Sequence, residues 1–228
     1  MPLYNNRLGV SAHNSRGVRR YCLRERVVLE ANIASMFAAL SATNEAILYA
    51  KSPEELYRQV CEAAVSSGDF LATAVFLLEP GTDRLQFAAG VGEEPGRLRQ
   101  IDISIVADTP EGSGVCGQAF RDRSISISND FLNDARSLAW RQGVASGHIG
   151  AVAGLPLTCN GRSVGVLLVT RRDAGSIDGP IVSLLERMSA NLSFALDNFV
   201  HEASRKDGGR AMRRLTRMFG AISSTSEA

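Results

Sequence analysis

The sequence contains few cysteines and histidines, and their spacing does not match metal sites or disulfide frameworks. Its 228 residues include only three histidines. The four cysteines are scattered as Cys22, Cys61, Cys116 and Cys159, with no C-x-x-C pair among them. This spacing argues against the usual zinc-binding and disulfide-rich classes. We therefore expect no metal site and a reducing, cytoplasmic location.

Long apolar runs and an excess of one charge are also missing. No run reaches the roughly 18 apolar residues that a transmembrane helix needs, so we expect no membrane segment. The net charge of +1 gives no overall field that would favour nucleic acid or an anionic membrane. Residues 1–24 differ, with five arginines and no acidic residue. We expect residues 1–20 to form a disordered tail.

Patterns typical of catalytic sites are absent as well. The glycine-rich segment 112–117 has no lysine, so it is not the loop that cradles phosphates in nucleotide-binding proteins. No residue pair suggests a nucleophile beside its general base. We expect no enzyme activity in this chain, and the sequence identifies no cofactor.

What the sequence does contain is a series of helical and strand patterns. The spacing of apolar residues predicts helices over residues 21–50, 53–68, 112–122, 134–145 and 181–201, with a break or bend at 206–209. It predicts strands over 70–78, 84–89, 101–105, 124–128, 150–157 and 163–170. Ser52 and Pro53 are a typical helix start, and Asn160-Gly161 is a strong signal for a type I′ hairpin turn. This order predicts an α+β fold, an antiparallel sheet of five or six strands with helices on one face.

The long amphipathic helices at both ends each carry one apolar stripe that something must cover. A second copy of the chain, packed in parallel as a homodimer through these helices, would cover both stripes. Alternatively, the two helices cover each other within one chain.

The end of the chain repeats an earlier segment. Residues 36–46 read MFAALSATNEA and residues 218–228 read MFGAISSTSEA, with seven of eleven positions identical. The offset of 182 residues fits one domain plus a connecting helix. We therefore predict an N-terminal signalling helix over 21–50, a domain over 51–202, and a linker helix over 203–228 that leads into a second, truncated module. The alternative is two similar amphipathic helices without a common origin.

Several motifs resemble the GAF domain, a small-molecule sensor module related to PAS domains. The matching segments are GVCGQA at 114–119, SISND at 126–130, GLPL at 154–157, NG at 160–161 and VGVL at 164–167. The resemblance covers about residues 45–202 and implies a non-enzymatic sensory module. The segments LSATNEAI and SPEELYRQVCEAAV are similar to GAF modules of bacterial proteins that make or degrade cyclic di-GMP. Such proteins often carry tandem sensors, and any GGDEF or EAL output domain would lie outside this chain.

The resemblance also implies a ligand pocket between one sheet face and the segments that link the middle strands. Mapped onto this sequence, the pocket residues are Phe87, Cys116, Asn129, Asp130, Phe131, Trp140, Arg141, His148 and Ile149. They offer aromatic rings, one carboxylate, one guanidinium and one imidazole among apolar walls, a typical mixture for a buried small-molecule site. The ligand itself is not identified.

Single residues of this set also have ordinary structural interpretations. Trp140 can be a packing residue and Asp130 a turn or cap residue. His148 is a candidate haem ligand but has no second metal-type neighbour. Cys116 stands at a helix start, where the helix dipole would lower its pKa, but free cysteines are more often buried.

The sequence departs from specialised GAF families. No histidine follows Cys116 as in bilin-binding domains, and the cyclic-nucleotide signature Asn-Lys…Phe…Asp-Glu is missing. The cysteines are also not clustered as in GAF-type methionine-sulfoxide reductases. Two alternatives to a sensor remain open. One is a structural dimerisation module whose pocket is filled by Phe131 and Trp140, and the other is a redox enzyme that uses Cys116.

Overall fold

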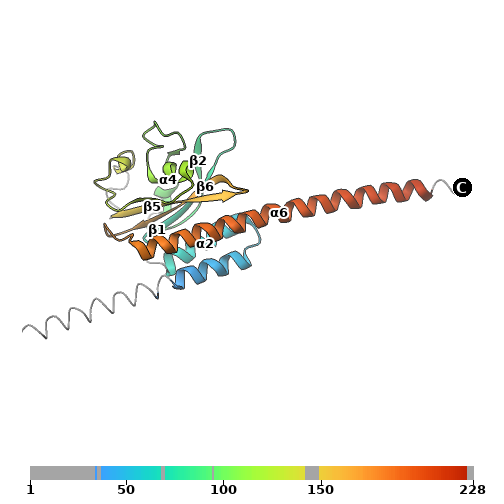
Figure 1. Cartoon of the computed structure of the whole chain (residues 1–228), viewed down its shortest axis with the longest axis horizontal. Coiled ribbons are helices and arrows are strands. Elements are labelled where there is room, and N and C mark those ends of the chain that lie inside the picture. Colours follow the sequence, from blue (N-terminus) through green and yellow to red (C-terminus); the bar gives the residue numbers. More distant parts are fainter. Residues whose placement is uncertain (1–33, 35–36, 68–69, 94, 142–148, 225–228) are drawn as a thin grey trace, which may run out of the picture.

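The computed structural model of the protein describes residues 34, 37–67, 70–93, 95–141 and 149–224, with side-chain detail up to residue 205 (Figure 1). A six-stranded sheet has the order β3-β2-β1-β6-β5-β4, and every neighbouring pair is antiparallel. The strands are β1 (Ala72–Leu78), β2 (Arg84–Gly92), β3 (Ile103–Ser104), β4 (Ser126–Ser128), β5 (Ala151–Cys159) and β6 (Arg162–Arg171). The predicted α+β class is confirmed.

The centre of the sheet follows directly from local sequence signals. The apolar run of β1 is paired on both sides, with β2 and with β6, so this strand lies inside the sheet. The predicted hairpin joins β5 to β6 through Asn160 and Gly161, which adopt φ values of 50° and 72°. Asparagine and glycine tolerate this left-handed backbone better than other residues, which explains why the turn is readable from the sequence.

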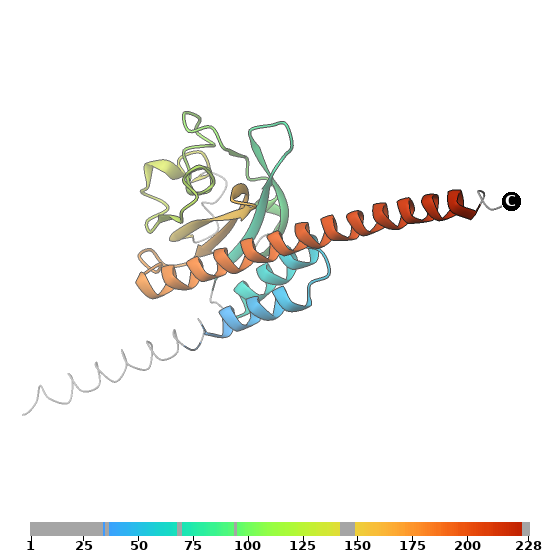
Figure 2. The same ribbon diagram turned by 45° about the vertical axis from the view of Figure 1, so that its right-hand side comes forward.

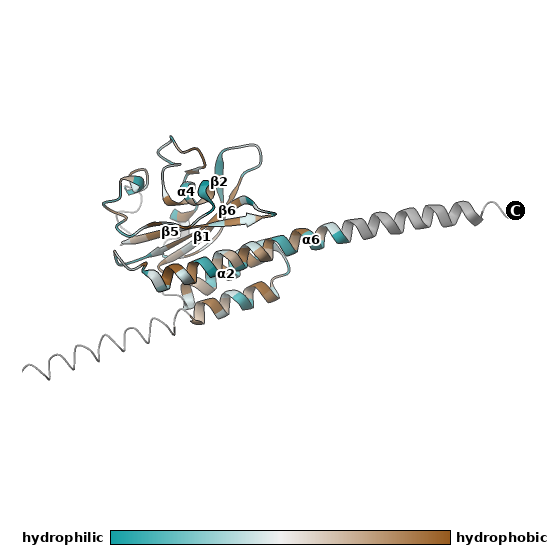
Figure 3. Cartoon of the chain, viewed as in Figure 1, coloured by the Kyte–Doolittle hydropathy of each residue, from teal (hydrophilic) through white to brown (hydrophobic). Residues whose placement is uncertain are grey.

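Helices α2 (Pro53–Ser67) and α6 (Gly179–Ser224) cover one face of the sheet, and a helix over residues 37–49 lies on their side away from the sheet (Figures 1 and 2). The start of α2 is fixed by Ser52, whose hydroxyl accepts a hydrogen bond from the Glu55 N–H at 3.2 Å. Figure 3 shows apolar and polar residues alternating along the described part of α6, as expected for a helix with one buried side.

The apolar stripe of α6 is covered within the chain. Leu185, Met188 and Leu192 are fully buried against the sheet and α2, and burying each such side chain contributes about 1.5–3 kcal/mol. The helix over 37–49 adds Ala39 and Ala46 to the same core. Over this length the stripe is covered within the chain, by the sheet rather than mainly by the N-terminal helix, and the parallel homodimer stays a prediction.

The opposite face of the sheet is covered by α4 (Val115–Asp122), the short α3 (Pro95–Leu98) and the loops between strands. Its core includes Phe76, Phe120 and Val166. Helix α4 lies very close to the sheet, because a Cβ at Gly154 would meet the Val115 carbonyl oxygen at 2.7 Å. Glycine at this position lets the helix and strand backbones touch.

Three predictions about local structure were wrong. Instead of a helix from Asp134, the chain forms one 3₁₀ turn, η1 (Ala135–Ser137), followed by turn residues 138–140. Side-chain bonds explain this, because Asp134 caps the turn by accepting a bond from the Arg136 N–H. Arg141 is helical, and the predicted remainder, 142–145, lies outside the described residues. Helix α6 crosses 206–209 without a break, since glycine weakens a helix but does not interrupt its hydrogen bonds as proline does.

The third error concerns the edge of the sheet. The predicted strand over 101–105 is reduced to the two residues of β3, which pair with Arg84 and Leu85. The chain before β3 departs from β2 and leaves a gap beside it.

Candidate functional site

Seven of the nine predicted pocket residues fall into two groups. Cys116 and Phe131 are buried in the core on the α4 face, and Phe87, Trp140 and Ile149 pack against that core while partly exposed. Asn129 and Asp130 are exposed at the end of β4. His148 lies outside the described residues. The ligand-binding role assigned to this set stays a prediction.

Trp140 is a packing residue in this structure. Its ring lies against Gly114, where a Cβ would meet the ring at 2.3 Å. Its indole N–H donates a hydrogen bond to the Asp102 carbonyl oxygen at 3.0 Å. The glycine is therefore required by the close approach of the ring, and Trp140 joins the segment before α4 to the segment before β3.

Asp130 and Arg141 make local contacts. The amide of Asn133 donates to the Asp130 carboxylate at 2.8 and 3.0 Å. Arg141 donates to the Asp134 carbonyl oxygen at 2.6 Å and to the Ser137 hydroxyl at 3.0 Å. These bonds stabilise the turns that follow β4.

Asn129 joins the sheet to the start of α6. Its amide nitrogen donates to the Ile177 carbonyl oxygen at 2.9 Å, and its amide oxygen accepts from the Ile177 N–H at 3.1 Å. Its backbone carbonyl also accepts from the Gly175 N–H at 2.7 Å. Asp178 follows directly and caps α6 by accepting from the Ile181 N–H at 3.2 Å. A displacement of β4 would therefore reach the first turn of α6.

A second attachment runs along α6. Residues Ser189, Ser193 and Asp197 are spaced by four and so share one side of the helix. The Ser189 hydroxyl donates to the Pro156 carbonyl oxygen, while Ser193 and Asp197 accept from the backbone N–H groups of Thr158 and Asn160 at 3.0 and 2.6 Å. Strand β4 pairs only with residues 152–154 of β5. The side chains of α6 thus hydrogen-bond β5 beyond this pairing, at Pro156 and Thr158, and the turn residue Asn160.

The expectation that the helix start lowers the pKa of Cys116 was wrong. Burial raises the pKa of this thiol to about 12, because the interior disfavours the thiolate. Burial likewise raises the pKa of Cys61 to about 12. The thiol of Cys116 is therefore protonated at neutral pH, which is unfavourable for nucleophilic or redox chemistry.

Sequence reasoning missed a polar network beneath β4. The Arg136 guanidinium donates to the Asp134 carboxylate at 2.8 Å, to the Ile127 carbonyl oxygen at 2.7 Å and to the Gln118 amide oxygen at 2.7 Å. Ser126 donates to the same Gln118 oxygen at 2.9 Å. The bonds from Arg136 hold the pKa of the Asp134 carboxyl well below its usual range. No regular spacing links Gln118, Ser126 and Arg136, so no sequence signal could have found this network.

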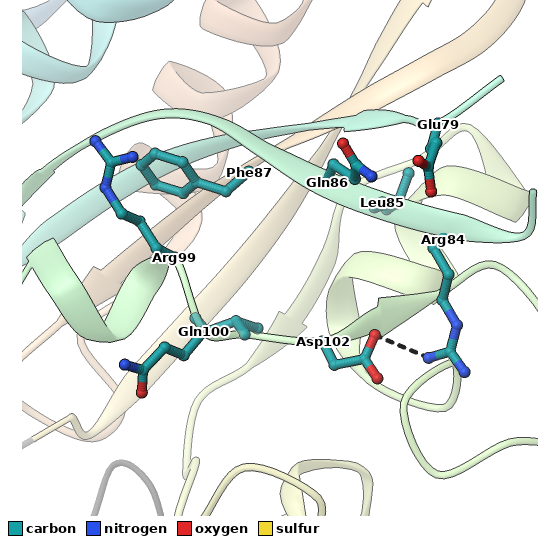
Figure 4. Close-up of a pocket in the computed structure, with 9 residues that line it drawn as sticks. Glu79, Arg84, Leu85, Gln86, Phe87, Arg99, Gln100 and Asp102 are labelled. Atoms are coloured by element: carbon teal, nitrogen blue, oxygen red, sulfur yellow. Dashed lines mark hydrogen bonds and ion pairs between the residues drawn. The ribbon is translucent and has the colours of Figure 1, made fainter.

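Sequence reasoning also missed an open cleft of about 540 Å³ between β2 and residues 99–102 (Figure 4). It is lined by Glu79, Arg84, Leu85, Gln86, Phe87, Arg99, Gln100, Ile101 and Asp102. Only Phe87 belongs to the predicted set. The cleft exists because β3 pairs with β2 over two residues only, so the segment before β3 stands apart from the rest of β2.

The two arginines of the cleft differ in their surroundings. Arg84 donates to the Asp102 carboxylate at 2.8 Å in an exposed ion pair. The guanidinium carbon of Arg99 lies over the Phe87 ring, 4.8 Å from its centroid. Figure 4 places Arg99 and Phe87 at one end of the cleft, and Arg84, Asp102 and Glu79 at the other. Across the described residues, no group of three or more histidine, cysteine or acidic side chains is placed to hold a metal ion.

Comparison with protein families agrees with this architecture. The family model for the GAF domain matches residues 50–197, more than half of the chain. The chain belongs to the GAF domain family. None of the helices in the described part of the chain combines the length and apolar character needed to cross a bilayer.

Solved structures with the same fold include proteins of different functions. The GAF domain of a phosphoenolpyruvate-protein phosphotransferase from Coxiella burnetii has a TM-score of 0.62 at 12% identity, covering 75% of this chain and 97% of that one. Free methionine-R-sulfoxide reductase from Neisseria meningitidis gives 0.59 at 17% identity, with 75% and 91% covered. A domain from Sinorhizobium meliloti, named as part of a two-component sensor histidine kinase, gives 0.53 at 16% identity, with 69% and 99% covered.

These identities are low, so the likeness to solved structures establishes the fold alone. A search of curated proteins gives no match.

Proposed function

We propose that this GAF domain is a non-enzymatic sensory module that passes a signal from its sheet along α6. The observation that carries the proposal is the double role of α6. Its first part belongs to the domain core, and its backbone continues past the sheet as one helix ending at Ser224 (Figures 1 and 2). A rigid helix of this kind can transmit a change at the sheet to whatever follows it.

The attachments of α6 support this route. Asn129 holds the segment just before α6 to β4, and Ser189, Ser193 and Asp197, farther along the helix, hold it to β5 and the turn after β5. A ligand that favours one position of the sheet segments would therefore favour one position of α6. Such a shift requires different affinities for the two arrangements.

The output and the assembly state are further parts of this proposal. We propose that residues 203–228 link the domain to a further module of the same chain, and that the downstream output makes or degrades cyclic di-GMP. The resemblance of LSATNEAI and SPEELYRQVCEAAV to GAF modules of such proteins supports this, as does the repeated segment at the end of the chain. We also propose a parallel homodimer, because Phe37, Leu48, Tyr49 and Phe194 are exposed on the terminal helices.

A change of helical register tests the sensory function. One residue inserted after Asp207 rotates everything downstream by about 100°, whereas seven inserted residues restore the original direction to within about 20°. In the protein carrying its downstream domain, we expect the single insertion to uncouple regulation and the seven-residue insertion to preserve it. Normal regulation with both insertions would contradict the proposal.

A structural dimerisation module is the second candidate. It is favoured by the way Cys116 and Phe131 fill the α4 face and by the packing of Trp140 on Gly114. Sedimentation of the wild-type chain and of Leu48→Glu tests the dimer that both candidates include. The two insertions after Asp207 separate the candidates, because a purely structural dimerisation module predicts no regulation that the single insertion could uncouple.

A further inference from the structure

We propose that the cleft beside β2 binds a small organic anion, a carboxylate or a phosphate monoester, whose charged group is held by Arg99. Only the role of this ligand as the signal that the domain senses rests on the proposed sensory function. Binding itself is tested separately. The cleft is distinct from the set of residues implied by the GAF resemblance, with which it shares only Phe87.

The guanidinium N–H groups of Arg99 have no acceptor among the described residues. A guanidinium carries five N–H groups, and no described residue accepts a hydrogen bond from Arg99, whose described contact is the face of the Phe87 ring. The other arginine of the cleft differs, because Arg84 is already paired with Asp102. Arg121 and Arg136, on the adjoining elements, donate to backbone carbonyls.

The Phe87 ring orients the guanidinium for planar recognition. A guanidinium over an aromatic face keeps its N–H edges free, and two parallel N–H groups match a carboxylate or phosphate. Side-chain amides of Gln86 and Gln100 supply further donors, and Leu85 and Ile101 supply apolar wall. The cleft volume of about 540 Å³ suits a metabolite rather than a bare ion.

The opposite end of the cleft limits the ligand further. Glu79 and Asp102 place two carboxylates there beside the single guanidinium of Arg84 (Figure 4). This end therefore carries a formal excess of negative charge, and like charges in one site repel. A second anionic group at this end would be disfavoured, so the far end of the ligand should be neutral or should donate hydrogen bonds. The inferred ligand is anionic at one end only.

Trp140 gives binding a readout. Its indole N–H bonds the backbone of Asp102, a residue that lines the cleft. Trp140 is the only tryptophan of the chain, so its indole N–H gives a single cross-peak in a ¹⁵N NMR spectrum. A ligand between Arg99 and Asp102 should shift both this cross-peak and that of the Arg99 Nε–H group.

The experiment compares probes of the same shape and different charge. Benzoate is anionic, benzamide neutral and benzamidine cationic, and phenyl phosphate separates phosphate from carboxylate recognition. Each is titrated to about 20 mM, a range that detects millimolar affinities, into the ¹⁵N-labelled chain. We expect benzoate or phenyl phosphate to shift the Arg99 and Trp140 signals saturably, at least about tenfold more tightly than benzamide, which corresponds to about 1.4 kcal/mol.

Two variants complete the test. Arg99 is exposed, so Arg99→Gln should fold normally, and we expect it to weaken anion binding at least about tenfold because a charge-assisted hydrogen bond is lost. The matched control is Arg58→Gln, which alters an exposed arginine of α2 and should leave binding unchanged.

Three outcomes would overturn the proposal. They are no saturable anion shift at Arg99, equal binding in Arg99→Gln, or equal affinity for benzamide or benzamidine. Equal affinity for benzamide or benzamidine would mean that the cleft binds ligands but does not select an anion. The insertion experiment after Asp207 tests the sensory function independently, so the two failures are distinguishable.

Discussion

Replacing Arg136 with methionine tests whether the network beneath β4 stabilises the domain. Methionine keeps the apolar stem but removes every side-chain donor, so the Asp134 carboxylate and the Ile127 carbonyl oxygen lose the guanidinium, while the backbone N–H of residue 136 still bonds Asp134. Hydrogen bonds to charged groups contribute about 1.5–3 kcal/mol each, and the arginine side chain is 35% exposed. Allowing for this exposure, we expect a loss of about 2–4 kcal/mol, measured by urea unfolding at pH 7.

The same substitution has a pH signature. Arg136 lowers the pKa of Asp134 in the folded protein, so the unfolded chain binds the proton more tightly than the folded chain. The resulting stability is fully present above the unfolded pKa of about 3.9 and is lost as the pH falls through the lower folded pKa. In Arg136→Met we expect a smaller loss of stability on acidification below about pH 5.

The control for this prediction is Arg58→Met. Arg58 pairs with Glu62 on the exposed side of α2, and such exposed pairs contribute about 0–1 kcal/mol. If Arg136→Met destabilised the chain no more than Arg58→Met, or if its acid sensitivity equalled that of the wild type, the network would not have the stabilising role inferred here.

Three further predictions concern other contacts. Gly114→Val should displace Trp140 and move its fluorescence emission to longer wavelength; an unchanged spectrum would show that the ring does not need the glycine. Asp197→Ala should cost about 1–3 kcal/mol and speed hydrogen exchange of the Asn160 amide, with no change expected for Ser204→Ala, an exposed control on the same helix. Cys116, whose pKa is raised to about 12, should react with iodoacetamide at pH 8 far more slowly in the folded than in the unfolded chain; equal rates would contradict its burial.

Where the fold could be predicted, the signal was local and strong. The Asn160-Gly161 turn depends on two residues that tolerate positive φ, and the start of α2 depends on a cap at Ser52 and a proline beside it. The buried strand β1 was predicted from a signal of the same kind, because a short, continuous apolar segment between turn residues is typical of a buried strand. The resemblance to the GAF family then assigned these elements to one known fold.

Where prediction failed, contacts that the apolar pattern does not record decided the structure. The pattern over 134–145 suggested a helix, but the bonds of Asp134 and Ser137 to nearby backbone stabilise a short turn instead. The helix start at Cys116 suggested a lowered pKa, but the sheet packed against α4 buries the thiol and raises it.

The sequence by itself determined the fold class, the hairpin and the helices α2 and α6, because these depend on backbone preferences and on the period of apolar residues. The family came from the resemblance of its motifs. Only the tertiary structure decided what covers α6 and where a cleft opens. Phe87 and Arg99 meet because the chain returns beside β2 and pairs with it over two residues only. The point at which two strands part is set by packing on both faces of the sheet, and no local pattern in either segment records it.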